Sequence, residues 1–178
     1  MDDHKESVQS SLNNPVNRIT WLVVFFSVLI WSGIGPEDRF TWVLEVAPAV
    51  LGLCVLIWTY RRVPLTGLVY VLILIHCVIL MVGGHYTYAK VPAFDWLAEC
   101  FDWKRNNYDK VGHFVQGFIP AMIAREVFIR HKVVTGCWWL RVLIVSFCLG
   151  LSAFYELIEW VVALGTGESA EAFLGTQG

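Results

Sequence analysis

The sequence has few charged residues: Asp, Glu, Lys and Arg make up only 16% of its 178 residues, whereas 57% are hydrophobic. Its mean hydropathy of +0.59 lies far above that of a water-soluble domain. No polar stretch between the hydrophobic runs is long enough to bury a core of its own. The composition therefore excludes a separate soluble domain and predicts a protein built for the lipid bilayer.

Several motifs are also absent. The five cysteines are scattered singly and no CxxC pair occurs, so neither a zinc site nor a disulfide is predicted. No nucleic-acid motif occurs and no basic patch lies outside the ends of the hydrophobic runs, which argues against a nucleic-acid partner. The first hydrophobic run lacks a basic start and an A-x-A site, so it is expected to remain as a span rather than to be cleaved.

Five hydrophobic runs are long enough to cross a bilayer as helices. They cover residues 19–35, 40–60, 64–84, 111–129 and 142–164. Because an open sheet edge cannot satisfy its hydrogen bonds in hydrocarbon, all five are expected to be helical. The sequence thus predicts an all-α, polytopic transmembrane helical bundle over residues 19–164, between a disordered tail at 1–18 and a polar tail at 165–178.

Basic residues set the expected orientation. Arg61 and Arg62 follow the second run, and Arg130 and Lys132 follow the fourth. The positive-inside rule places these two short loops, and with them the amino terminus, in the cytosol. Residues 85–108, rich in Trp, Tyr, Asp and Lys, are then expected to form an external cap over the bundle.

Ionisable residues inside membrane spans are costly, and those of this chain are expected to gather at the outer depth. The candidate catalytic residues are Asp109, His113, Glu156 and Glu159, and the further site residues are Glu45, His85 and Gln116. Asp109 and His113 are four residues apart, and Glu156 and Glu159 are three apart, so each pair shares a helix face. Two facing pairs of this kind predict a polar site.

Three chemistries fit that site: a divalent metal held by His113, Glu156 and Glu159, acid/base catalysis, or a proton relay. Purely structural roles are the alternative, with Asp109 as the N-cap of its helix and His113 as a core histidine that donates to a glutamate. The glutamate pair is harder to explain by packing. Two carboxylates one turn apart repel unless one is protonated, bound to a cation or paired with His113.

Three segments are long and specific: GGHYTYAKVP at 83–92, NYDKVGHFVQGFIPAMIAREV at 107–127, and YELIEW followed by AFLGTQG between 155 and 178. They resemble the YjdF-type family of bacterial inner-membrane proteins. The resemblance implies a multi-pass protein of the inner membrane, with a further acidic stretch and a sixth span after residue 178, but no activity. It implies a polar signature at His85, Asp109, His113, Gln116, Arg125, Glu126, Glu156 and Glu159.

A shorter stretch, DKVGHF at 109–114, is similar to a motif of VanZ-like membrane proteins. A match of six residues is too short to assign their function to this chain. Three functions stay open. The first is a metal-dependent or acid/base hydrolase of a lipid or envelope substrate. The second is a small transporter or proton-coupled carrier, suggested by the same carboxylates and by Pro120, which is expected to interrupt the fourth span. The third is a non-catalytic protein that assembles with itself or with other membrane proteins.

Overall fold

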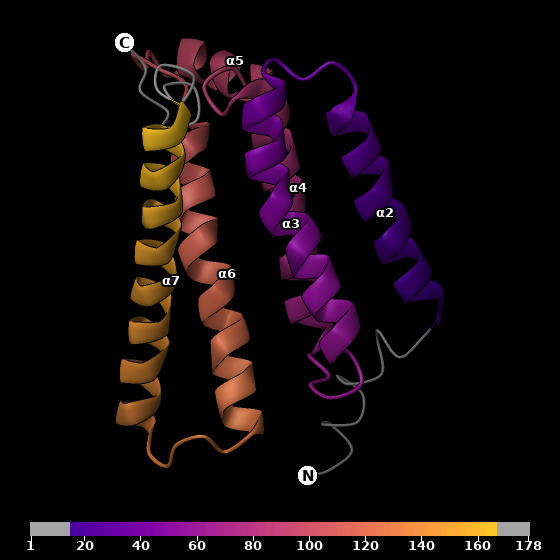
Figure 1. Ribbon diagram of the computed structural model, residues 1–178, viewed down its shortest axis with the longest axis vertical. Coiled ribbons are helices and arrows are strands. Elements are labelled where there is room, and N and C mark those ends of the chain that lie inside the picture. The colour runs from indigo at the N-terminus through magenta and orange to yellow at the C-terminus, as the bar shows by residue number, and fades with distance from the viewer. Residues whose placement is uncertain (1–14, 167–178) are drawn as a thin grey trace.

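The computed structural model describes residues 15–166, and within that range the chain folds as six helices with no strand (Figure 1). They are α2 (Pro15–Gly33), α3 (Arg39–Thr59), α4 (Gly67–Tyr86), α5 (Pro92–Cys100), α6 (Tyr108–Arg130) and α7 (Cys137–Thr166). Five are long and run side by side, and the short α5 lies across one end of the bundle. The all-helical architecture predicted from the hydrophobic runs is confirmed.

Four segments are long and apolar enough to cross a membrane: α2, α3, α4 and residues 137–162 of α7. Helix α6 is as long, at 23 residues or about 34 Å, but charged residues lie near both of its ends. It packs between α4 and α7 and runs alongside them (Figure 1). The fourth predicted run is therefore a helix of spanning length, although its composition is less apolar than that of the other four.

Helix α4 occupies the centre of the bundle, because it packs against α2, α3 and α6. Its sequence is almost entirely aliphatic, so it can face protein on several sides without burying unpaired polar groups. Met81 of α4, Phe25 of α2 and Ile119 of α6 are the largest fully buried hydrophobic side chains among the described residues. Helix α7 instead packs against α6, and none of its spanning window is buried, which leaves its apolar flank for lipid.

The helix bounds differ from the predicted runs at several ends. Helix α2 begins at Pro15 rather than at residue 19, since proline is favoured at the first position of a helix. Helix α4 continues to Tyr86, so His85 lies in its last turn rather than after it. Helix α7 reaches Thr166. Of the predicted tails, residues 1–14 and 167–178 lie outside the described residues.

Proline 120 does not interrupt its helix, contrary to the prediction. Helix α6 is continuous from Tyr108 to Arg130, with Pro120 buried inside it. A proline inside a helix removes one backbone hydrogen bond, but packing on both sides can hold the helix together. Here α4 and α7 flank α6 and supply that packing.

The two ends of the bundle differ in chemistry. The cap end carries residues 87–107 with α5, where buried Asn106 donates to the Val91 carbonyl at 3.0 Å and to Asp95 at 2.8 Å. The basic end carries the α3–α4 loop with Arg61 and Arg62 and the α6–α7 loop with Lys132, and both loops lie at the same end in Figure 1.

A carboxylate joins two helices at the basic end. Glu126 of α6 accepts hydrogen bonds from the backbone N–H of Thr66 at 2.6 Å and from its hydroxyl at 2.7 Å. Thr66 is the N-cap of α4, so Glu126 satisfies a free N–H at that helix start. Arg130 donates to the same carboxylate at 2.8 Å from one turn further along α6. Glu126 therefore pairs with Arg130 within its own helix and also holds α4 to α6.

Candidate functional site

The side chain of Tyr88 lies between two helices at the cap end. Helix α4 ends at Thr87 in the left-handed conformation, with φ of 55°, and Tyr88 follows with φ of 56°. The backbone N–H of Tyr88 donates to the carbonyl of Gly83 at 2.9 Å, which turns the chain back over the helix. This turn places the Tyr88 ring against Gly83 of α4 and Gly112 of α6.

Both contacts require glycine. A Cβ atom at Gly83 would lie 2.3 Å from the Tyr88 ring, and one at Gly112 would lie 2.8 Å from it. Two non-bonded carbon atoms attract each other best at a separation of about 3.5–4.0 Å. The two glycines therefore form the slot that admits the ring.

Tyr88 holds a buried carboxylate. Its side chain hydrogen-bonds Glu45 of α3, which is only 7% exposed. Burial, followed by the charge of Glu45, raises the pKa of Tyr88 well above its ordinary value of 10.0. The phenol therefore stays protonated and can donate to the carboxylate. Gly84 lies close to the base of the Glu45 side chain, because an added Cβ would be 3.0 Å from the Glu45 Cβ.

Helix α7 contributes the second carboxylate. Glu159 is partly buried, and its charge interacts with Glu45 of α3, with Glu156 on its own helix and with His113 of α6. Tyr155, one turn before Glu159, interacts with both Glu45 and Glu159. We call Glu45, Tyr88, Tyr155, Glu159 and His113 the polar cluster. It joins α3, α6, α7 and the turn after α4.

Some of the predicted site residues belong to the polar cluster, whereas Asp109 and His85 have other partners. Glu45 and His113 each interact electrostatically with Glu159, and Glu156 lies beside Glu159 with its own side chain exposed. His113 is also exposed, at the surface of α6. Gln116 is partly buried on the same helix, one turn further from the cap.

Asp109 has a different partner. Its carboxylate pairs with Arg105 at 3.0 Å, and its second oxygen is buried without a hydrogen-bond partner among the described residues. The cap residue of α6 is Asn107, so the interpretation of Asp109 as the N-cap is wrong. Asp109 instead lies in the first turn, where the positive end of the helix dipole still stabilises its negative charge.

His85 lies toward α2. Its Nδ1 is 2.9 Å from the backbone carbonyl of Ser32, and because a carbonyl only accepts, that nitrogen carries the proton. The imidazole ring also lies 4.7 Å from the ring of Trp31. These contacts hold the end of α4 to the end of α2.

No three His, Cys, Asp or Glu side chains within residues 15–166 are grouped closely enough to hold a metal ion. The set of His113, Glu156 and Glu159 as metal ligands stays a prediction. The cluster contains two carboxylates, one imidazole and two phenols, which are side chains of the kinds that act as acids and bases.

Sequence reasoning missed Tyr88 and Tyr155 as members of the cluster. Tyr88 lies in a run of aromatic residues that is equally typical of a membrane interface, and Tyr155 lies within an apolar run. The usable signal for Tyr88 was the glycine at position 112, one residue before His113, together with the Gly83–Gly84 pair. Small residues at such positions permit close approach of another group.

Comparisons with known proteins agree with the architecture. Residues 17–178 match the family model described as "Predicted membrane protein (DUF2238)". The chain is 49% identical over 151 residues to the inner membrane protein YjdF of Escherichia coli (strain K12), an alignment that covers 85% of this chain and 72% of that relative. No solved structure matches. The chain therefore belongs to the DUF2238 family and is a multi-pass protein of the bacterial inner membrane, in contact with the lipid bilayer.

Proposed function

We propose that this protein is an inner-membrane enzyme that uses acid/base chemistry at the polar cluster to hydrolyse a lipid or another envelope substrate. The observation that carries the proposal is the buried carboxylate of Glu45, held by Tyr88 and close to Glu159 of a helix far away in sequence. Charged groups within membrane spans are expensive, and they are retained mainly where they do chemistry or move protons.

Each residue has a chemical role in this proposal. His113 and Glu159 interact, so together they can take a proton from an attacking water. Glu45, in its protonated form, gives its proton to the leaving group and becomes the carboxylate that Tyr88 positions through its hydrogen bond. Glu156 lies three residues before Glu159 on the same helix and adds a second carboxylate beside this proton-accepting pair.

The surroundings of the cluster favour an amphiphilic, anionic substrate. A hollow of about 670 Å³ lies on the cap side, and three of its six lining residues are basic: Lys104, Arg105 and Lys110, beside Asp102, Trp103 and Asn107. Lys110 and His113 are one turn apart on α6, so the hollow and the cluster are neighbours. Cations and an indole ring at a membrane surface suit a phosphate-bearing headgroup, while the exposed faces of α6 and α7 suit its apolar part.

The test compares full-length wild-type protein with Glu45→Gln and Glu159→Gln in a host that lacks its own relative. Mass spectrometry of membrane lipids and envelope components is expected to show one species depleted and one product accumulated with the wild type. Loss of a general acid or base slows such reactions by about 10²–10⁴-fold. Cells with either variant should therefore show the same profile as the host without the protein. Glu99→Gln, an exposed carboxylate on α5, serves as the control and should behave as wild type.

Identical profiles from all four proteins would reject the enzyme. Elemental analysis of the purified wild type beside a His113→Ala, Glu159→Gln double variant then separates the two hydrolytic routes. Stoichiometric metal that is lost in the double variant would make His113, Glu156 and Glu159 metal ligands. Metal in neither protein would leave the direct acid/base route.

A proton-coupled carrier is the second candidate, favoured by the way that the cluster links α3, α6 and α7. The continuity of α6 through Pro120 removes one of its original supports. Reconstituted into liposomes, a carrier would dissipate an imposed pH gradient, and Glu45→Gln would abolish that flux. The third candidate, an assembly protein, predicts that Glu156→Gln and Glu159→Gln together leave both stability and phenotype unchanged.

The proposal places the cap end outside and the amino terminus in the cytosol, supported by three basic residues in the two loops of the other end and by Arg130 at the end of α6. Two native cysteines make this testable, since Cys100 on the cap and Cys137 at the start of α7 are both exposed. A membrane-impermeant maleimide added to intact spheroplasts is expected to label Cys100 and spare Cys137. The reverse pattern would invert the topology, and Cys100→Ser confirms which thiol reacts.

A further inference from the structure

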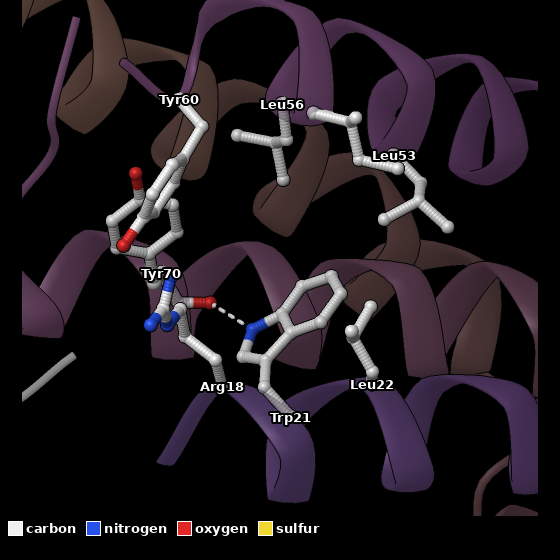
Figure 2. A pocket seen from close by; sticks show the side chains of 8 residues that line it. Arg18, Trp21, Leu22, Leu53, Leu56, Tyr60 and Tyr70 are labelled. Atoms are coloured by element: carbon white, nitrogen blue, oxygen red, sulfur yellow. Dashed lines mark hydrogen bonds between the residues drawn. The ribbon is translucent and has the colours of Figure 1, made fainter. Parts of the chain in front are cut away.

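A second feature lies at the basic end, away from the polar cluster. A cavity of about 220 Å³ opens between α2 and α3 and has Tyr70 of α4 as its floor. Figure 2 shows that Leu22, Leu53 and Leu56 line one part of it, while Arg18, Tyr60 and Tyr70 gather at the other. The cavity thus has an apolar body and a single cationic group at its polar end.

The walls of this cavity are held in place. The indole N–H of Trp21 donates to the backbone carbonyl of Tyr70 at 2.9 Å, which fixes α2 on α4 (Figure 2). The guanidinium of Arg18 lies over the Tyr60 ring, 5.5 Å from its centroid, so the charge is held across the gap between α2 and α3. An apolar cavity that is formed by such contacts suits a hydrocarbon chain.

We propose that an anionic phospholipid occupies this cavity, with an acyl chain along the leucines and its phosphate on Arg18. The cavity lies on a membrane-facing side, because Ile57, which lines it, is 66% exposed and Leu22 is 38% exposed. Arg61 and Arg62 lie in the loop at the same end and add positive charge near the headgroup. Basic pockets between transmembrane helices select anionic lipids by this combination of charge and apolar contact.

Native mass spectrometry of the full-length protein tests the proposal, with phosphatidylglycerol or phosphatidylethanolamine of the same acyl chains as the probe. The wild type is expected to retain phosphatidylglycerol about fivefold more strongly, the effect of one cation on an anionic headgroup. Arg18→Gln should reduce that preference to near one, whereas Arg61→Gln, at the same end but outside the cavity, should keep most of it.

A second pair of variants tests the apolar part. Leu22→Trp fills the cavity and should lower the retention of both lipids several-fold, whereas Val23→Trp, the exposed neighbour that does not line it, should not. Both tryptophans lie on partly exposed faces of α2, and thermal melting in detergent checks that the variants fold. Equal retention of the two lipids by the wild type, or retention that Leu22→Trp leaves unchanged, would overturn the proposal.

Discussion

Replacing Gly83 with alanine is expected to lower the free energy of unfolding by about 3 kcal/mol, which is in the upper range for overpacking. The new methyl group would lie 2.3 Å from the Tyr88 ring. The ring cannot move aside, because Gly112 of α6 lies against its other edge. A Cβ atom at position 112 would be only 2.8 Å from the ring. Alanine gains about 1 kcal/mol of helix propensity over glycine, but a clash between two fixed groups exceeds that gain.

Unfolding of the purified protein in mixed micelles measures this effect. Gly117→Ala on α6 is the matched control, since nothing lies within 4 Å of the position that its Cβ would occupy. It should leave stability unchanged or slightly raised. The double variant Gly83→Ala, Tyr88→Ala should recover part of the loss, because removal of the ring also removes the clash. A Gly83→Ala protein as stable as the wild type would mean that Tyr88 does not occupy the slot.

Replacing Glu126 with alanine is expected to cost about 2–3 kcal/mol by separating α4 from α6 at the basic end. The carboxylate accepts three hydrogen bonds, two from Thr66 and one from Arg130. Its removal leaves the N-cap N–H of α4 and the guanidinium of Arg130 without this acceptor, and the Arg130 Nε is already buried without one. Groups left unpaired in a partly buried site account for most of such a loss.

The adjacent residue provides the control. Arg125→Ala removes an exposed charge from the same turn of α6 and should change stability by less than about 0.5 kcal/mol. Thr66→Val keeps the backbone N–H and loses only the hydroxyl, so it should cost about half as much as Glu126→Ala. Equal effects of Glu126→Ala and Arg125→Ala would show that the carboxylate does not join the two helices.

The polar cluster was only partly predictable from the chain order. Spacing placed Glu156 beside Glu159, and comparable depth in the membrane suggested that Glu45 and His113 would meet them. Spacing could not reveal that Asp109 pairs with Arg105 instead, because both residues lie at a helix start where small changes in the loop decide which partner is in reach. Depth in the membrane also could not separate His85 from the residues of the polar cluster. His85 faces α2 instead, because of the rotation of α4.

The long apolar runs predict a bundle of membrane-spanning helices, because a segment in lipid must satisfy every backbone hydrogen bond within itself. Tertiary structure alone decided which helix lies at the centre and which polar groups meet. Two left-handed residues after α4 turn Tyr88 back into a slot that two glycines leave open, and that turn brings its hydroxyl to Glu45. Hydropathy indicates whether a helix is surrounded by lipid or by water. Which groups a side chain contacts depends on the rotation of its helix and on the geometry of the loops, and neither can be predicted from one hydrophobic run.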